Sequence, residues 1–443
     1  MQTRGVGSQS TRRSSQHSFG HKRLSLVVAR ASNHAMRNTA CLYFDYNATT
    51  PIRDEVKDVI VSLLNHHGNP SSTHAHGQFP KQVIETARAQ VARSIGARGP
   101  KGVFFCSCGT EADQWALWTA VCEWKQVNGP DSVPHIVASA VEHPAVLVNL
   151  KFLAESLGWI TYTLVGVDED GVLDLAALDA SITPNTCLVS IMHSNNETGA
   201  MQDFNAINSV LEPHREQRKG AQDRPLALHS DLAQSIGRST IDVNDMKLDF
   251  ATIVGHKIGA PKGIAALWVA EDRRESLVPL IHGGGQESGK RSGTENLLLC
   301  GALGAAIGIA TFDLDEQIQS MREMRDRFRD VLLEAANLQA DSPNVMINGP
   351  VDDAYRLPNT LSISFKGVDA ATVIAKLGDR LAISSGSACH GGGGDGSVLG
   401  AMGRDESWRK GTFRISVGFG TTAAEVDEGA KILGEHLRIA TSI

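Results

Sequence analysis

The chain has neither a long apolar run nor an excess of positive charge. No uninterrupted apolar stretch in its 443 residues approaches the roughly 20 residues that a helix needs to cross a bilayer. Acidic residues outnumber lysines and arginines by 49 to 42, which gives a formal net charge of −7. Because binding to a phosphate backbone depends on basic side chains, we expect no nucleic-acid partner, and we expect no membrane partner either.

Cysteine pairs at the spacings of zinc sites are also absent. The number of cysteines is odd, which argues against a disulfide framework and fits a reducing compartment; the seven are Cys41, Cys106, Cys108, Cys122, Cys187, Cys300 and Cys389. Cys106 and Cys108 have no second cysteine or histidine pair nearby, so we interpret them as structural residues. We therefore predict no metal site.

The first 44 residues contain no aspartate or glutamate. They are rich in serine and carry seven basic residues, namely Arg4, Arg12, Arg13, Lys22, Arg23, Arg30 and Arg37. A basic, acid-free segment without a long apolar core is typical of an organellar transit peptide and not of a secretory signal. We predict a leader over residues 1–38 that directs the chain to a plastid or mitochondrion. The alternative is a disordered tail without an address, on a cytoplasmic protein.

Beyond the leader, short apolar segments alternate with helical patterns. Such alternation predicts an α/β fold with a mostly parallel sheet covered by helices, and its strands are expected near 136–138, 162–165, 188–192, 226–228, 250–254 and 265–269. A chain of 443 residues exceeds one ordinary core, so we expect two domains. The large domain is expected over 55–300 and a smaller α+β domain over 301–443, with 41–54 packing near the latter.

Three glycines, Gly301, Gly304 and Gly308, lie within an apolar helical pattern. They do not follow a strand, so we interpret them as sites of close helix packing and not as a dinucleotide-binding fingerprint.

A lysine follows one of the apolar segments. Phe250–Val254 leads into Gly255-His256-Lys257, so a buried strand is expected to end in a tight turn that carries Lys257. An amine held in such a turn is suited to imine chemistry. The alternative is an ordinary exposed loop lysine.

Two further segments make pyridoxal phosphate a candidate cofactor. Asp231 follows the apolar segment 226–228, where a carboxylate could keep a pyridine ring nitrogen protonated. Gly109 and Thr110 open a helical pattern after a strand-like segment. Backbone N–H groups, a hydroxyl and the positive end of a helix dipole suit a phosphate there, although Thr110 could also be an ordinary N-cap.

Seven motifs follow one another along the chain: Cys108-Gly109-Thr110-Glu111, Glu142-His143, Asn195 to Gly199, Asp231 to Gln234, Gly255-His256-Lys257, Arg291 to Asn296, and Ser384 to Cys389. In this order they resemble the NifS-like cysteine desulfurases and selenocysteine lyases, of the class V aminotransferase family. The resemblance runs from about Tyr43 to the C-terminus. It implies a pyridoxal-phosphate enzyme of fold type I that releases sulfur or selenium from an amino acid and leaves alanine.

The resemblance also implies a role for each matching residue. Lys257 would hold the cofactor through an imine, and His143 would stack on the ring and assist catalysis, unless it is simply a capping or core histidine. The other cofactor ligands implied are Gly109, Thr110, Asn196, Asp231, Gln234, His256 and Thr294. Thr294 would reach the neighbouring subunit's cofactor, which implies a homodimer. Asn47 and Arg414 would bind the substrate, with the planar guanidinium clamping its carboxylate.

Cys389 lies in the most glycine-rich part of the chain. Residues 384–396 contain six glycines in thirteen positions, a composition that predicts a loop. A polar loop offers no apolar neighbours in which to bury a thiol, so a reactive cysteine is favoured over a structural one. The resemblance implies that Cys389 takes part in the sulfur or selenium chemistry.

Two positions depart from the common desulfurase pattern. Val254 stands where many desulfurases carry a serine that donates to the phosphate, and Phe419 stands where relatives often carry arginine. Val254, together with the pair Cys389-His390, resembles the selenocysteine lyases. We therefore expect a lyase that releases selenium from L-selenocysteine and passes it to an acceptor protein. The alternatives are a cysteine desulfurase that forms a persulfide on Cys389 and a catalytically silent scaffold.

Overall fold

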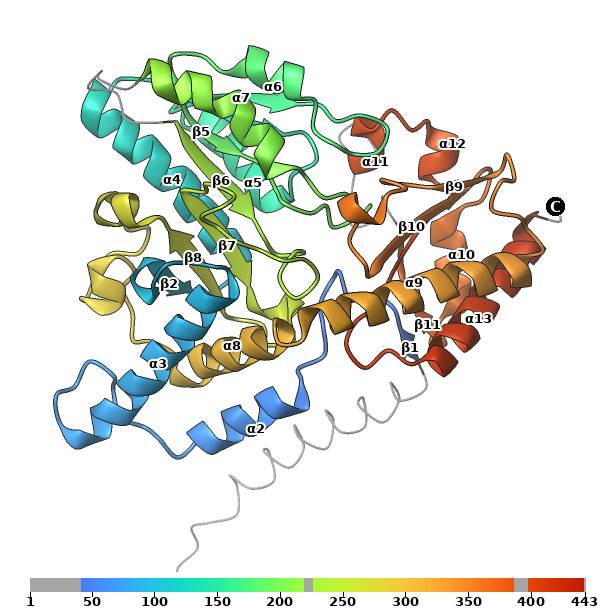
Figure 1. The fold of residues 1–443 in the computed structure, drawn as a ribbon, viewed down its shortest axis with the longest axis horizontal. Helices are drawn as coiled ribbons and strands as arrows, with labels where there is room; N and C mark the ends of the chain where they lie inside the picture. The colour runs from blue at the N-terminus through green and yellow to red at the C-terminus, as the bar shows by residue number, and fades with distance from the viewer. Residues whose placement is uncertain (1–40, 219–225, 386–396, 442–443) are drawn as a thin grey trace, which may run out of the picture.

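Two large β-sheets, of seven and four strands, organise the part of the chain that the computed structural model describes, residues 41–218, 226–385 and 397–441 (Figure 1). The expected α/β architecture, with a mostly parallel sheet, is confirmed. The predicted leader and Cys389 lie outside the described residues.

The seven-stranded sheet has the order β2-β8-β7-β6-β5-β3-β4, and only β8 runs antiparallel to its neighbours. Each expected strand is present within a few residues of its expected position. The strands are β2 (Val103–Cys106), β3 (His135–Ser139), β4 (Thr161–Val165), β5 (Thr186–Ser190), β6 (Ala227–Asp231), β7 (Phe250–Val254) and β8 (Ala265–Val269). All except β4 are buried along their whole length, which explains their unbroken apolar runs.

Helices cover both faces of this sheet. Alternate residues of β2 separate the two cores: Phe104 packs with the helices α4 and α5, whereas Phe105 packs with the opposite layer. The first layer contains α4 (Gly109–Asn128), α5 (Pro144–Lys151) and a π-helical turn at Phe152–Ser156. The second contains α2 (Asp54–Leu63), α3 (Ala75–Ser94), α6 (Leu175–Ser181), α7 (Phe204–Gln217) and α8 (Leu297–Ala310).

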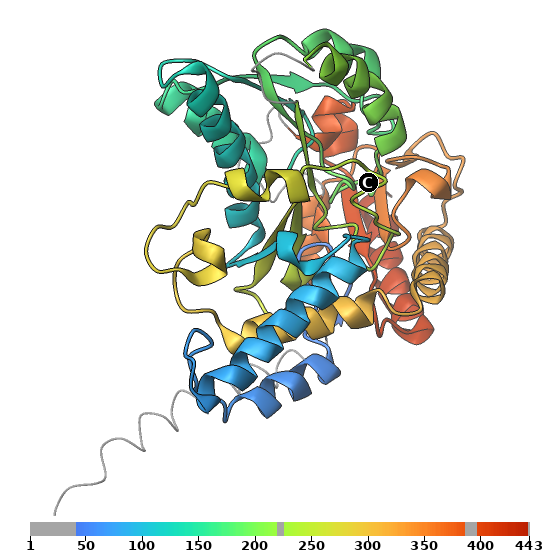
Figure 2. The same cartoon turned by 60° about the vertical axis from the view of Figure 1, so that its left-hand side comes forward.

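The four-stranded sheet is antiparallel, in the order β12-β13-β10-β9. The long helices α9 and α13 lie side by side against it (Figures 1 and 2). The elements of this part are α9 (Leu314–Ala336), β9 (Val345–Ile347), β10 (Thr360–Phe365), α10 (Ala370–Leu377), β11 (Leu381–Ala382), β12 (Ser384–Ser385), α11 (Val398–Ala401), α12 (Glu406–Arg409), β13 (Thr412–Ser416) and α13 (Ala423–Thr441). The short strand β1 (Leu42–Tyr43) pairs with β11.

The change from one unit to the other falls between α8 and α9. α8 packs on α2 and α3, whereas α9 packs on α13, and the two helices meet at 76°. Asp313, at the break, has a left-handed φ of 48°. The boundary expected after residue 300 lies inside α8, so we propose that the units divide after Ala310. No single helix of the described residues is long and apolar enough to cross a membrane; α8 and α9 meet the length and composition only as a bent pair, and α8 is largely buried.

We predict that Gly304→Ala destabilises the fold while Gly308→Ala does not. A Cβ at position 304 would lie 2.6 Å from the Cα of Ala87 on α3, whereas the atom nearest to a Cβ at position 308 would be a Gln90 nitrogen 3.9 Å away. The expected loss for Gly304→Ala is about 1–3 kcal/mol. Gly308→Ala should be neutral or stabilising by up to about 1 kcal/mol, because alanine favours helix. Equilibrium unfolding in urea measures both, and equal effects at the two positions would contradict this interpretation of the glycines.

Candidate active site

Lys257 ends a 3₁₀ turn, Gly255–Lys257, that follows β7 directly. The turn needs glycine at 255 because a Cβ there would lie 2.9 Å from the carbonyl oxygen of Ile264. Lys257 Nζ donates to the backbone carbonyls of Asn47, at 2.5 Å, and Ala48, at 2.9 Å. Burial lowers the pKa of Lys257 to about 7, and the nearby charges of Arg238 and Arg414 act in the same direction. A substantial fraction of this amine is therefore neutral near pH 7.

Asp231 ends β6, the parallel neighbour of β7, and pairs in register with Thr252. Parallel strands end at the same edge of a sheet, which brings the carboxylate and Lys257 to one side of the molecule. The Oδ1 atom accepts from the N–H of Ala233 at 2.8 Å. Burial raises the pKa of Asp231 to about 6, against the opposing effects of that N–H and of Lys257. The expected position of Asp231 at a strand exit is thus present.

A second buried carboxyl, Asp113 on α4, lies near Asp231 and was not among the predicted site residues. Its Oδ1 has no hydrogen-bond partner among the described residues, and His229 Nε2 is 3.6 Å away. Burial, followed by the charge of Asp231, raises the pKa of Asp113 well above its usual range. The sequence could have indicated Asp113, because it is an acid within a helical stretch that is otherwise apolar on that side.

The turn at the start of α4 lies against the end of β7. A Cβ on Gly109 would come within 2.7 Å of a Val254 methyl carbon, so only glycine fits there without a shift. Cys108 occupies the N-cap position without capping the helix through its side chain, and the side chain of Thr110 is exposed. The first N–H groups of a 20-residue helix, with one hydroxyl beside them, thus face outward at this point.

His256 and His143 lie near this turn. His256 Nδ1 is 3.1 Å from Thr49 Oγ1, and burial lowers the pKa of His256 to about 4, so its imidazole is neutral. His143 is exposed and caps α5, accepting from the N–H of Ala145 through Nδ1 at 3.1 Å. His143 is therefore a capping residue, as the alternative interpretation has it. It also lies close enough to His256 for its charge to lower the pKa of that imidazole.

Gln234 is held by two neighbours. Its Nε2 donates to the carbonyl of Asn47 at 3.0 Å, and its Oε1 accepts from Arg238 at 2.7 Å. Arg238 also donates to the carbonyls of Tyr46 and Lys257. Arg238 is thus a structural link that sequence reasoning missed, because none of its partners except Gln234 is close to it in the sequence.

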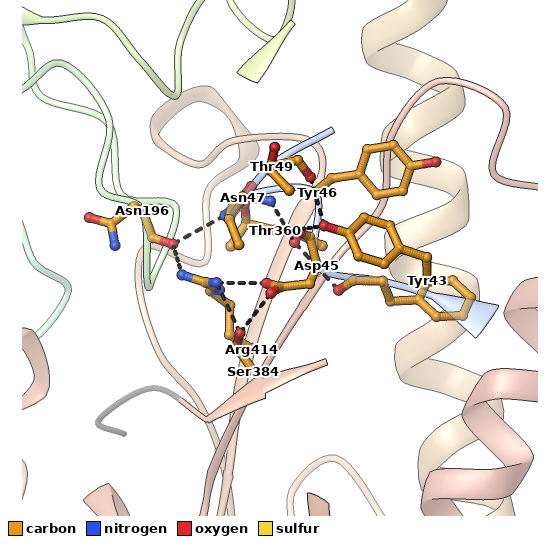
Figure 3. Close-up of polar contacts among 12 residues, drawn as sticks. Tyr43, Asp45, Tyr46, Asn47, Thr49, Asn196, Thr360, Ser384 and Arg414 are labelled. Carbon is orange, nitrogen blue, oxygen red and sulfur yellow. Dashed lines mark hydrogen bonds and ion pairs between the residues drawn. The ribbon is translucent and has the colours of Figure 1, made fainter. Parts of the chain in front are cut away.

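Asn47 and Arg414 lie together beside this edge of the sheet (Figure 3). The side-chain amide of Asn47 and Nη1 of Arg414 both donate to the carbonyl of Asn196, at 3.2 and 3.1 Å. Arg414 Nη2 forms an ion pair with Asp45 Oδ1 at 2.7 Å. The structure therefore brings the two predicted substrate residues and Asn196 into contact, and it adds Asp45, which the motifs did not single out.

Thr294 is exposed in the loop between Arg291 and α8, and it lines a small cavity of about 150 Å³ together with Ser107. Arg291 in the same loop forms an ion pair with Glu111 at 2.9 Å, which holds this loop against the start of α4. Within the described chain Thr294 has no hydrogen bond to the other predicted cofactor ligands. Its assigned role in a neighbouring subunit stays a prediction.

These groups fit pyridoxal phosphate. The N-terminus of α4, Thr110 and the neutral imidazole of His256 suit a phosphate, and the buried carboxylate of Asp231 suits a protonated ring nitrogen. Lys257 supplies an amine whose lowered pKa favours imine formation. In the described part of the chain, no group of three or more histidines, cysteines or carboxylates is placed to hold a metal ion.

Comparison with known proteins gives consistent matches along the chain. A family profile described as Aminotransferase class-V matches residues 42–428. The cysteine desulfurase of Trichormus azollae is 38% identical over 397 residues, which cover 89% of this chain and 92% of that protein. The mitosomal cysteine desulfurase of Trachipleistophora hominis is 36% identical over 411 residues, covering 92% of this chain and 87% of its own. A solved structure described as a NifS-like protein has a TM-score of 0.78 and 31% identity, covering 90% of this chain and 100% of that one.

We predict that Val254→Ser tightens the binding of pyridoxal phosphate. The valine borders the turn at Gly109 with a methyl group and cannot donate a hydrogen bond, whereas serine could donate one to the phosphate. After removal of the cofactor, titration with pyridoxal phosphate should give a dissociation constant about three- to tenfold lower than that of the wild type. Val254→Ala, which removes the methyl groups without adding a donor, is the matched control. Equal affinities of the serine and alanine variants for pyridoxal phosphate would show that a hydroxyl at position 254 does not contribute to cofactor binding.

Proposed function

Because the chain belongs to the class V aminotransferase family of pyridoxal-phosphate enzymes, we propose that it is a cysteine desulfurase, which takes sulfur from L-cysteine and leaves L-alanine. The family, fold type I and the cofactor were all expected from the motifs and are confirmed. The observation that supports the proposal best is the meeting of Lys257 and Arg414 at one segment, through Asn47 and Asn196. An amine and a guanidinium brought to one segment suit an amino-acid substrate, whose carboxylate the guanidinium can bind.

Selenocysteine lyase is the main expectation from the sequence, and the comparisons do not support it, because the relatives reported above are named as cysteine desulfurases. The structure gives a physical reason why Val254 does not distinguish a selenocysteine lyase from a cysteine desulfurase. Its side chain packs against Gly109 at the start of α4, where it affects the phosphate turn. That position associates Val254 with the predicted phosphate turn, so it carries little information about sulfur or selenium.

The chemistry divides between the cofactor and the residues around it. Pyridoxal phosphate supplies an electron-accepting ring when it is bound. Asp231 keeps a proton at the ring nitrogen, and Lys257 Nζ takes the proton from the substrate α-carbon, which its lowered pKa allows near neutral pH. The carbonyls of Asn47 and Ala48 orient Nζ by accepting its hydrogen bonds. Arg414 binds the substrate carboxylate through its guanidinium.

Cys389 is the proposed sulfur acceptor. Its thiolate attacks the sulfur of the substrate, so that a sulfur–sulfur bond forms while the substrate's carbon–sulfur bond breaks. The electron pair of the broken bond stays with the carbon, which then takes a proton and becomes the methyl group of alanine. The persulfide left on Cys389 is the form in which sulfur would pass to an acceptor protein.

We also propose that the enzyme is a homodimer in which Thr294 completes the neighbouring phosphate site. Two features support this proposal: the threonine is exposed, and its loop is tied to the first turn of α4 through Arg291 and Glu111. An exposed side chain in this place is accessible to a second copy of the chain.

We predict that Cys389→Ala abolishes the formation of alanine from L-cysteine, by at least about 100-fold, because no other residue is proposed to take the sulfur. The persulfide should also disappear from the protein, as measured by thiol labelling and mass spectrometry.

Lys257→Ala should abolish turnover of both L-cysteine and L-selenocysteine, and borohydride should fix the cofactor on Lys257 of the wild type. Strong selenocysteine turnover with negligible cysteine turnover in the wild type would overturn the desulfurase proposal.

We predict that residues 1–38 direct the protein to an organelle. The segment is basic and acid-free, and one relative is named as mitosomal, so a mitochondrion-type organelle is proposed here; the comparisons give no support for a plastid. A fusion of residues 1–38 to a fluorescent protein should accumulate in that organelle, while a fusion with its arginines and lysines changed to glutamine should not. Diffuse cytosolic fluorescence from the unchanged segment would contradict the prediction.

A further inference from the structure

Arg414, the proposed carboxylate anchor, is already paired with a carboxylate of its own chain (Figure 3). Asp45 Oδ1 lies 2.7 Å from Arg414 Nη2, and Ser384 Oγ lies 3.2 Å from the same nitrogen. Nη1 donates to the carbonyl of Asn196 at 3.1 Å. The side chains of Arg414 and Asp45 are only 8% and 18% exposed, so this pair is shielded from the solvent that weakens surface ion pairs.

The hydrogen atoms of the guanidinium limit how a second carboxylate could bind. A carboxylate contacts arginine at two points either through Nη1 and Nη2 or through Nε and Nη2, and both pairs include Nη2. Nη2 has two hydrogens, and Asp45 and Ser384 accept both of them. Nε is buried and has no partner among the described residues. Of the two nitrogens in the pair Nε and Nη2, Nε is therefore free to donate to a ligand, whereas Nη2 is occupied.

We propose that Asp45 is a specificity-determining residue that occupies Arg414 in place of the substrate and must yield Nη2 when an α-carboxylate binds. This inference rests on the proposed function, in which Arg414 binds the substrate carboxylate. Asp45 thereby lowers the affinity for every ligand that carries an α-carboxylate. It leaves ligands without that group unaffected, because they do not compete for Nη2.

Asp45 keeps other partners when it yields Nη2. Its Oδ2 accepts from Ser384 Oγ at 2.9 Å, and its charge acts on Lys257. Its backbone is held by a parallel bridge to Ser416 on β13, the strand that carries Arg414. The carboxylate therefore stays close to the guanidinium and can return to Nη2 when the ligand leaves.

The test compares two ligands that differ by one carboxylate, L-alanine and ethylamine, on the holoenzyme. Their dissociation constants are measured from the change in the visible absorbance of the cofactor. Asp45→Asn should bind L-alanine about three- to tenfold more tightly than the wild type, because the neutral amide competes less well for Nη2. Ethylamine binding should stay within about twofold, and KM for L-cysteine should fall by the same factor as the constant for L-alanine.

Two controls separate this effect from a general loss of charge. Asp54→Asn also removes one negative charge, but Asp54 is exposed and pairs with Lys57. The dissociation constants of both ligands should therefore stay unchanged in this variant. Ser384→Ala removes the other partner of Nη2 and leaves the ion pair in place, so its effect on L-alanine should be smaller than that of Asp45→Asn. If Asp45→Asn does not fold with a full complement of cofactor, Asp45→Ser replaces it as a smaller neutral side chain.

Unchanged or weaker binding of L-alanine by Asp45→Asn would overturn the proposal, since it would mean that Asp45 orients Arg414 and does not compete with the ligand. Equal tightening for L-alanine and ethylamine would overturn it too, because the effect would not depend on the carboxylate. A wild-type enzyme whose absorbance responds to neither L-alanine nor L-cysteine would instead contradict the proposed function.

Discussion

The hydrogen bonds of one buried residue, Asn47, connect the parts on which the site depends. Asn47 is only 1% exposed, so an unpaired polar atom on it would cost roughly 1–3 kcal/mol. Its backbone carbonyl accepts from Gln234 and Lys257, its N–H donates to Ser416, and its side-chain amide contacts the carbonyl of Asn196 and the side chains of Thr360 and Asn359. The two sheets thus meet around a residue whose hydrogen-bonding groups are satisfied by both of them.

The chemistry of the site follows from this junction between a strand edge and a second unit. The seven-stranded sheet supplies Asp231 and Lys257 at the ends of adjacent parallel strands, with the helix of Thr110 beside them. The smaller unit supplies Arg414 from β13. Burial at the junction brings the pKa of Lys257 to about 7 and that of Asp231 to about 6. Lys257 can therefore exchange its proton near neutral pH more readily than it could in water.

Short sequence patterns predicted the features that depend on neighbouring residues, namely the strands and the turn that carries Lys257. The apolar segments became strands, and the turn after Phe250–Val254 placed Lys257 at the expected edge of the sheet. The helix break at Asp313 was not predicted, because its left-handed conformation has no glycine or proline to mark it. Phe419, the other departure from the common desulfurase pattern, packs against the guanidinium of Arg53, whose Cζ lies 3.8 Å from the centroid of its ring.

Contacts across the chain explain most of what the sequence could not predict at the site. Asp45 and Arg414 are 369 positions apart, and their pairing depends on the bridge of Asp45 to Ser416, on the strand that carries Arg414. Arg238 bonds to Tyr46 and Lys257 for a similar reason. No periodicity or spacing reports such contacts; they become visible only when the fold is known. The role of Cys389 stays a prediction because the residue lies outside the described part of the chain.

The pairing of the first strand with one of the last has a consequence for the order in which the protein is made. Leu42 pairs with Leu381, and Asp45 bridges to Ser416, so the N-terminal segment gains its partners only after nearly the whole chain has left the ribosome. Until then the carbonyls of residues 47 and 48 have no second sheet to hold them beside Lys257. A chain still being synthesised therefore lacks an assembled site, and the enzyme acquires its activity only when residues 42–45 have met β11 and β13.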